Sequence, residues 1–251
     1  MPDPLGTLQG EVHVWLIHPA SWHDAFKQAG LVLSADERAT ADEFADEQLR
    51  NRYLAAHCAV RRLLSLYADT APESWVFCRG KRGRPRIAGD SDLRFSLSYG
   101  DDLIAVAITR EVELGIDIVS TRRRVDVMQI AEHAFAPTEV AVLRSMGAAS
   151  ARDRFFDCWA LKEAYAKAVG TGFWEDPRRY AFSFPLQGTL AFQPGGNEAG
   201  EQWQFMLAST PRDHRLALAV RSGSTRPRKI VARIAPGGDA IAFVVDRTFP
   251  A

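Results

Sequence analysis

Two kinds of hydrophobic pattern alternate along the chain and predict its helices and strands. Apolar residues spaced three and four apart predict helices over residues 34–67, with a break near Glu47, over 125–146 and over 151–169. Within 125–146, Pro137 fits a first helical position. Ser34 and Glu37 have capping-box spacing at the start of the first helix, and glycines at 170 and 172 end the last one. Short alternating or continuous apolar runs predict strands over 11–17, 93–101, 102–109, 112–119, 180–184, 189–194, 203–209, 215–220, 230–235 and 240–246.

The order of these elements predicts an α+β fold with an internal echo. The strand-turn-strand sequence RFSLSYGDDLIAVAIT, residues 94–109, resembles WQFMLASTPRDHRLALAV, residues 203–220, and each follows helical sequence. We therefore expect an N-terminal α/β half over 1–110 and a similar C-terminal half over 111–222. Residues 223–251 form a strand-like C-terminal extension whose role the sequence leaves open, and PGGNEAG at 194–200 indicates a surface turn.

Charge and cysteine content narrow the classes of protein. The 251 residues carry 31 basic and 31 acidic side chains, so no overall field favours nucleic acid or an anionic membrane. No run approaches the ~18 apolar residues of a membrane span. The N-terminal sequence MPDPLGTLQGEVHVW has no signal-peptide pattern, and three widely spaced cysteines fit reduced thiols, so we expect a cytoplasmic protein.

Several enzyme classes lack their motifs in this sequence. It contains no GxxxxGKS/T phosphate loop, no GxGxxG after a strand, no GxSxG elbow and no HExxH. Its six histidines do not cluster at metal-ligand spacing, and His13 alternates with apolar residues on a predicted strand. Any chemistry must therefore use carboxylate, lysine and arginine side chains.

A carboxylate inside the apolar strand VELGIDIV is the first candidate for that chemistry. Asp117 lies between two isoleucines, and a buried carboxylate costs several kcal/mol unless it is paired or bound to a metal. Gly115 removes a side chain and lets another element approach the backbone closely. The alternative is an aspartate at a strand end that faces solvent.

The helix FFDCWALKEAYAKAVGTG supplies the second candidate. Trp159, Glu163 and Lys167 follow one another at intervals of four and share one helix face. Two carboxylates with substrate phosphates form a usual Mg²⁺ site, so Asp117 and Glu163 would hold the ion and Lys167 would contact a phosphate. The alternative is a surface Glu–Lys pair worth about 0.2–0.5 kcal/mol.

A basic loop is the third candidate. The segment RGKRGRPR, residues Arg79–Arg86, has five cationic residues and no acid, and its glycines and proline make it a poor helix or strand. It would hold further phosphate groups of a polyphosphorylated small molecule. A solvated loop is one alternative, and a nucleic-acid contact is another, which the zero net charge and the acidic first helix oppose.

These motifs resemble those of the Sfp-type 4′-phosphopantetheinyl transferases. GIDIV followed by WALKEAYAKAVGTG is similar to the family's G-I/V-D strand and its W-x-x-K-E-S/A-x-x-K-x-x-G helix. RNRYLAAHCAVRRLLS, GRP, FSLSYGDD and AFAPTE are similar to four further family elements. The resemblance covers about residues 34–185.

The resemblance implies a fold, an activity and a set of site residues. The fold would consist of two pseudo-symmetric α/β halves with the active site in the cleft between them. The enzyme would be of the holo-acyl-carrier-protein synthase type. It would transfer 4′-phosphopantetheine from coenzyme A to a serine of an apo acyl or peptidyl carrier protein. The reaction would depend on Mg²⁺ and would release 3′,5′-ADP. Asp117 and Glu163 would hold Mg²⁺, Lys167 would neutralise the leaving phosphate, and Glu163 would also be the general base. Coenzyme A contacts would come from Arg52, Lys81, Arg82, Arg84, Ser98, Tyr99 and Lys167.

Two positions depart from the family pattern. Many members have an acidic residue two positions after the metal-binding aspartate, but the chain has Val119 there, so water would complete the coordination. The usual histidine after Ser98 is Tyr99, a phenol that can hydrogen-bond phosphate but is neutral at pH 7.

The expected partners are coenzyme A and a carrier protein. The paired halves favour a monomer. The three arginines at 122–124 directly follow the GIDIV strand and would either steer an acidic carrier protein or form a solvated charged turn. The alternative function is a non-catalytic module that binds coenzyme A or another phosphorylated ligand.

Overall fold

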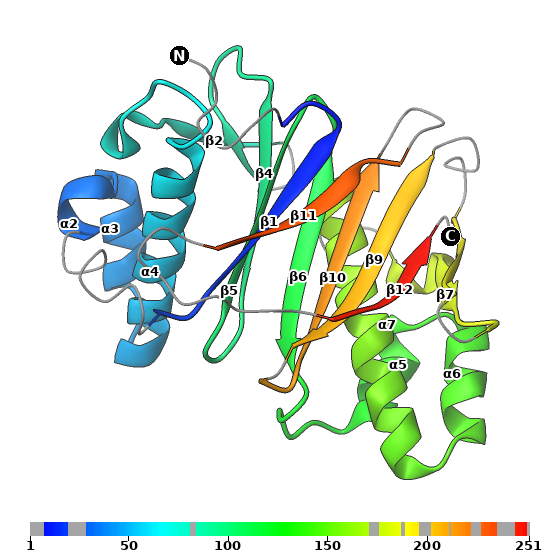
Figure 1. The fold of residues 1–251 in the computed structure, drawn as a ribbon. Helices are drawn as coiled ribbons and strands as arrows, with labels where there is room; N and C mark the ends of the chain where they lie inside the picture. Colours follow the sequence, from blue (N-terminus) through cyan, green and yellow to red (C-terminus); the bar gives the residue numbers. More distant parts are fainter. Residues whose placement is uncertain are drawn as a thin grey trace. The chain divides into compact units, whose positions relative to one another are not determined.

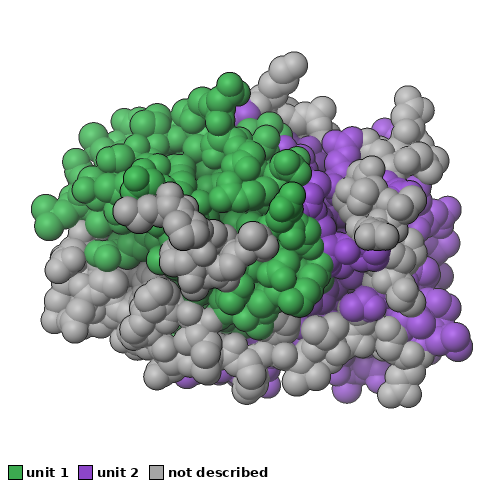
Figure 2. Space-filling view, turned by 45° about the horizontal axis from the view of Figure 1, so that its top comes forward, with its two compact units in different colours: residues 1–79, 85–111, 229–241 green, residues 80–84, 112–228, 242–251 purple. Residues whose placement is uncertain are grey.

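The helices and strands form two compact units in a computed structural model of the chain. The structure describes residues 8–19, 29–80, 84–170, 176–186, 189–195, 202–210, 212–221, 227–234 and 244–249. Unit 1 takes in residues 1–79, 85–111 and 229–241, and unit 2 takes in residues 80–84, 112–228 and 242–251 (Figure 2). The C-terminal extension therefore contributes residues to both units.

A four-stranded sheet forms the centre of unit 1 (Figure 1). Its order is β11-β1-β5-β4, and β5 is antiparallel to β1 and β4, whereas β11 is parallel to β1. The apolar face of helix α4 contacts β4 and β5 and supplies much of the core. The strands are β1 (Glu11–Ile17), β4 (Leu93–Tyr99), β5 (Ile104–Arg110) and β11 (Lys229–Ile234), and the helices are α2 (Ala29–Val32), α3 (Ala35–Asp42), α4 (Glu47–Leu64) and the 3-10 turn η2 (Pro72–Ser74).

The predicted break in the first helix separates α3 from α4. The capping box of Ser34 and Glu37 is confirmed at the start of α3. Asp46 then caps α4 by accepting hydrogen bonds from the amides of Gln48 and Leu49. The first predicted helix is therefore two helices because a second capping residue begins a new one.

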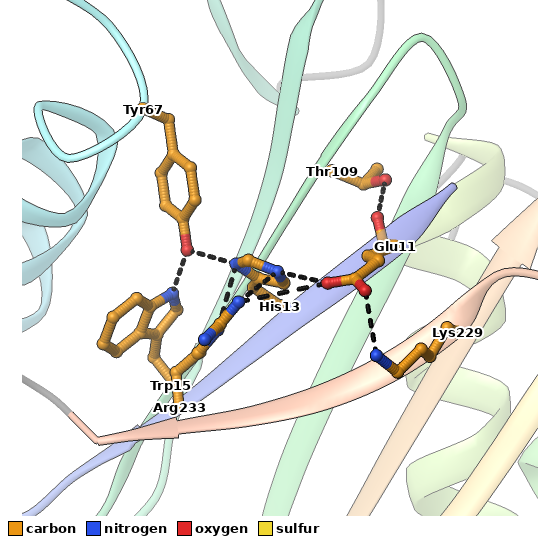
Figure 3. A network of polar contacts seen from close by, with 7 residues as sticks. All are labelled: Glu11, His13, Trp15, Tyr67, Thr109, Lys229 and Arg233. Atoms are coloured by element: carbon orange, nitrogen blue, oxygen red, sulfur yellow. Dashed lines mark hydrogen bonds and ion pairs between the residues drawn. The ribbon is translucent and has the colours of Figure 1, made fainter. Parts of the chain in front are cut away.

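The extension strand β11 is joined to β1 by a polar network (Figure 3). His13 is fully buried, with its Nδ1 2.7 Å from the Tyr67 hydroxyl and its Nε2 2.9 Å from Glu11 Oε2. Across the parallel pair, Arg233 Nη2 lies 2.9 Å from His13 Nε2, and Lys229 Nζ lies 3.0 Å from Glu11 Oε1. These contacts add side-chain bonds to the backbone pairing of the two strands.

Unit 2 has a second four-stranded sheet, covered by the helix α7 (Figure 1). All its strands are antiparallel, in the order β12-β9-β10-β6. The strands are β6 (Leu114–Ser120), β9 (Trp203–Thr210), β10 (His214–Arg221) and β12 (Val244–Phe249), with a small hairpin of β7 (Ala181–Ser183) and β8 (Ala191–Gln193). The helices are α5 (Val127–Ala134), α6 (Pro137–Ser145), α7 (Ala148–Val169) and the 3-10 turn η4 (Pro177–Arg179).

The helical pattern predicted over 125–146 is confirmed as two helices, the second of which begins at Pro137. Phe135 and Ala136 have extended backbone conformations, so the segment forms two helices, α5 and α6. Pro137 occupies the first turn of α6, where its missing N–H removes no helical hydrogen bond.

The two units share one strand order, which explains the internal echo. Within unit 1 the order β1-β5-β4 places the first strand beside the third, and β6-β10-β9 repeats this arrangement in unit 2. The two similar sequences form the hairpins β4–β5 and β9–β10. The predicted α+β class is confirmed, and β11 and β12 extend one sheet each.

The basic loop differs from its prediction. Arg79, Pro85 and Arg86 lie in the paired strands β2 (Phe77–Arg79) and β3 (Pro85–Ile87), so the loop is the turn of a hairpin. Lys81, Arg82 and most of the predicted turn at 194–200 lie outside the described residues. Within the described ranges, no helix combines the length and the apolar character that a membrane crossing needs.

Candidate active site

Strand β6 and helix α7 bring the two predicted acidic candidates together in unit 2. The helix lies so close to the strand that a Cβ on Gly115 would be 2.0 Å from the Ala164 oxygen and 2.5 Å from the Ala168 nitrogen. No other residue type allows this approach of backbone to backbone. Because strand side chains alternate between faces, Asp117 lies on the same face as Gly115 and points to the helix.

Asp117 is buried and paired with a lysine from the helix. Its side chain is 9% exposed, and Lys167 Nζ lies 2.7 Å from its Oδ1 and donates a second hydrogen bond to the Ile116 oxygen at 3.1 Å. The structure thus contradicts the alternative of a solvent-facing aspartate. It also contradicts a simple surface Glu–Lys pair, because Lys167 is bonded to the strand.

Glu163 lies one helical turn before Lys167, on the same helix face. Burial and then the negative charge of Asp117 raise the pKa of Glu163 to about 7, although the Lys167 ammonium opposes them. A carboxyl with this pKa can accept or donate a proton near neutral pH. It can equally act as a metal ligand once a cation offsets the charge of its neighbour.

The donor set fits a Mg²⁺ ion that also takes oxygens from a substrate. Mg²⁺ is usually bound by one or two carboxylates together with water and phosphate oxygens. Among the described residues, no three or more His, Cys, Asp or Glu side chains gather into a group. Val119 is 5% exposed and belongs to the hydrophobic core beneath α7, so its position offers no third protein ligand. Within the part of the chain that the structure describes, Asp117 on β6 and Glu163 on α7 are therefore the candidate carboxylate ligands.

The lysine that precedes Glu163 has a structural role that the sequence analysis did not assign. Lys162 is 5% exposed, and its Nζ lies 2.9 Å from Glu139 Oε2 and donates to the Pro177 and Tyr180 oxygens at 2.8 Å each. The Glu139 carboxylate also accepts hydrogen bonds from the Ala136 and Phe182 amides. This buried pair ties α7 to α6, η4 and β7. The sequence offered one sign of this role for Glu139, because it is an acidic residue at the third position of a helix that starts with proline.

Arg84 is bonded to protein groups of unit 2. Its Nη1 donates to Glu113 Oε2 at 2.6 Å and to the Ala168 oxygen at 2.9 Å, and its Nη2 donates to the Leu114 oxygen at 2.7 Å. Its side chain is 11% exposed. Sequence reasoning did not identify Glu113 as its partner.

The other predicted coenzyme A contacts that are described belong to unit 1. Ser98 is buried, and Tyr99 is partly exposed at the end of β4, where burial raises the pKa of its hydroxyl. Arg52 on α4 lies at the same strand end, since its Nη1 is 3.4 Å from Asp101 Oδ1. The structure therefore brings these three residues to one region of unit 1.

The three arginines at 122–124 are exposed beyond the end of β6. Arg152 on α7 donates hydrogen bonds to the backbone oxygens of Thr121 and Arg123, which fixes the course of this turn. The side chains are thus presented on the surface, as both alternatives in the sequence analysis require.

Comparisons with known proteins identify the family of the chain. A sequence profile of the 4′-phosphopantetheinyl transferase superfamily matches residues 113–219, which include β6 and α7. The chain is 34% identical over 175 residues to the 4′-phosphopantetheinyl transferase HetI of a Nostoc species, covering 68% of this chain and 73% of HetI. It is 26% identical over 247 residues to a phosphopantetheinyl transferase of a Thraustochytrium species, covering 89% of this chain and 85% of the relative.

A solved structure with partial similarity is the holo-acyl-carrier-protein synthase of Thermotoga maritima, with a TM-score of 0.33, 23% identity, and coverage of 43% of this chain and 62% of that one. The similarity to HetI spans more than two thirds of both proteins at over 30% identity. The chain belongs to the 4′-phosphopantetheinyl transferase superfamily.

Proposed function

We propose that the protein is an Sfp-type enzyme that transfers the 4′-phosphopantetheine group of coenzyme A to a serine of an apo acyl or peptidyl carrier protein. The observation that carries the proposal is the convergence of Asp117, Glu163 and Lys167 between β6 and α7. Two close carboxylates and an ammonium group suit a diphosphate with its metal ion. The family membership supports the reaction class.

In this proposal, Asp117 and Glu163 would hold Mg²⁺ at the diphosphate of coenzyme A. When bound, the ion supplies charge neutralisation at the diphosphate. Lys167 remains within reach of the same group and adds positive charge where the leaving phosphate develops negative charge.

The transfer forms one bond and breaks one bond. The carrier serine Oγ attacks the β-phosphorus of coenzyme A, and the bond from this phosphorus to the bridging oxygen breaks, so that 3′,5′-ADP leaves. Glu163 accepts the proton of the serine hydroxyl as the general base. Positioning and electrostatic stabilisation supply most of the rate enhancement, as in other phosphoryl transfers.

The remaining assignments concern the substrates. Arg52, Ser98 and Tyr99 contact the 3′-phosphate and adenine side of coenzyme A, with Lys81 and Arg82 from the basic loop. The arginines at 122–124 steer an acidic carrier protein, and the enzyme acts as a cytoplasmic monomer.

The mass of the carrier protein tests the proposal directly. The protein is incubated with coenzyme A, Mg²⁺ and an apo carrier protein, and the carrier should gain the mass of one phosphopantetheine group. Asp117→Asn should abolish the gain, and so should chelation of Mg²⁺, whereas the exposed Asp153→Asn on the same helix as Glu163 should not. Binding of coenzyme A without any mass gain would favour the non-catalytic binding module, and absence of both would reject the two functions together.

A further inference from the structure

The side chain of Arg84 makes hydrogen bonds within the protein that a residue serving only to contact the substrate would not need. It reaches the last turn of α7 and the first residues of β6, the two elements that carry the candidate active site. We infer that Arg84 is a positioning residue, whose guanidinium group fixes the C-terminal end of α7 against the start of β6 and so sets the separation of Lys167 and Asp117. The inference rests on the proposed function for its catalytic consequence but not for the contact itself.

The first support is the choice of acceptors. Ala168 is next to Lys167, and its oxygen is one of the last four carbonyls of α7, which have no partner inside the helix pattern. Leu114 directly precedes Gly115, the point at which strand and helix touch. One planar guanidinium group therefore bridges the helix and the strand beside their closest contact.

The second support is the charge balance around Arg84. The Glu113 carboxylate lies 2.6 Å from Nη1, so the guanidinium charge is already paired. Three of the five N–H groups of an arginine are used by Glu113, Ala168 and Leu114. A positive group at a helix C-terminus is also favourable for the helix dipole. These contacts hold a structural element in place without any phosphate.

The third support is that the contact needs the shape of arginine. Lysine has the same charge, but its ammonium is a compact group that cannot present a planar fork to acceptors on two elements. The side chain also lies beside the turn after α7, because a Cβ on Gly170 would be in ordinary contact with Arg84 Cδ, at 3.5 Å. A lysine should therefore keep the charge and lose the bridge.

These features separate a positioning role from a contact with the 3′-phosphate of coenzyme A. If Arg84 binds the phosphate, Arg84→Lys should retain most activity, and removal of the competing carboxylate by Glu113→Gln should leave coenzyme A binding unchanged or tighter. If Arg84 positions α7, then Arg84→Lys and Glu113→Gln should share one defect. Because the Glu113 carboxylate cannot itself attract a phosphate group, Glu113→Gln distinguishes the two roles more clearly than Arg84→Lys does.

The experiment combines hydrogen exchange with kinetics on the full chain. In Arg84→Ala, Arg84→Lys and Glu113→Gln, amide exchange in a peptide covering the last turn of α7 should accelerate at least about tenfold over the wild type. With coenzyme A and with dephospho-coenzyme A, kcat should fall about 10-fold to 100-fold by the same factor, and the ratio of the two KM values should stay constant. Arg144→Ala, which breaks the exposed pair with Glu132, should change neither readout.

Three results would overturn the inference. They are unchanged exchange in Glu113→Gln and Arg84→Lys, wild-type activity in Arg84→Lys, and a KM increase in Arg84→Ala that is confined to coenzyme A. If Arg84→Ala fails to fold, the two milder variants still decide the question. Hydrogen exchange requires no turnover. A wild-type protein that transfers nothing would therefore reject the proposed function, while the exchange data would still test the positioning role of Arg84.

Discussion

Replacing Lys162 with methionine tests how the helix that carries Glu163 is held in unit 2. Lys162 and Glu139 are 5% and 4% exposed, and the ammonium also serves the oxygens of Pro177 and Tyr180. The substitution leaves a buried carboxylate without its counter-charge and two carbonyls without their donor. Removing one partner of such a pair costs about 3–5 kcal/mol. For a chain of this length, that corresponds to a fall in Tm of roughly 10 °C.

Urea unfolding together with native-state hydrogen exchange of the α7 amides measures this loss. Glu139→Gln keeps an acceptor for one of the two backbone amides that bind the carboxylate oxygens, and the double variant with Lys162→Met restores neutrality at the site. Its loss should be smaller than the sum of the single losses by about 1–3 kcal/mol. The control Arg144→Met breaks an exposed pair and should cost less than about 1 kcal/mol. Strictly additive losses, or a loss below about 1 kcal/mol for Lys162→Met, would refute the reasoning.

Three further changes test other parts of the structure. Gly115→Ala places a Cβ 2.0 Å from a backbone oxygen, so it should lower the free energy of unfolding by about 3 kcal/mol and remove most transfer activity. Gly147→Ala has open space around the new Cβ and should cost less than about 1 kcal/mol in the same urea titration. Burial would raise the pKa of Glu37, but hydrogen bonds from His57 and the Ser34 amide, together with the charge of Arg61, lower it to about 2. The folded state therefore loses about 3 kcal/mol of stability as the pH falls from 5 to 2. Glu37→Gln should flatten this acid limb, and an unchanged limb would contradict the assignment. Val119→Glu should destabilise the protein by several kcal/mol, because the side chain belongs to the core; an unchanged Tm with an altered metal preference would mean that it reaches the metal site instead.

The sequence predicted those features of the structure that depend only on residues close together along the chain. The capping box at Ser34, the helix start at Pro137 and the close approach at Gly115 each follow from residues a few positions apart. The pairing of strands and of charges does not. Nothing in the sequence pattern of β11 and β12 says that they extend different sheets, since both are short strands that mix apolar and polar residues. Likewise, several acidic residues could in principle have met Arg84, and only the folded chain shows that Glu113 does.

The candidate site buries Glu163 near the Asp117 carboxylate, and this burial, together with the negative charge of Asp117, opposes folding when Glu163 is charged. Raising the pKa of Glu163 from 4.5 to about 7 means that the folded state holds its proton more tightly, so stability falls by about 3 kcal/mol as the pH rises through this range. A flexible pair of elements would relax by separating. Here α7 cannot move away, because Gly115 sets backbone contact with the strand and Lys162 fixes the far side of the helix. The rigid scaffold therefore holds Glu163 in an unfavourable environment that a bound cation would relieve, as the proposed binding of a metal ion with a diphosphate requires.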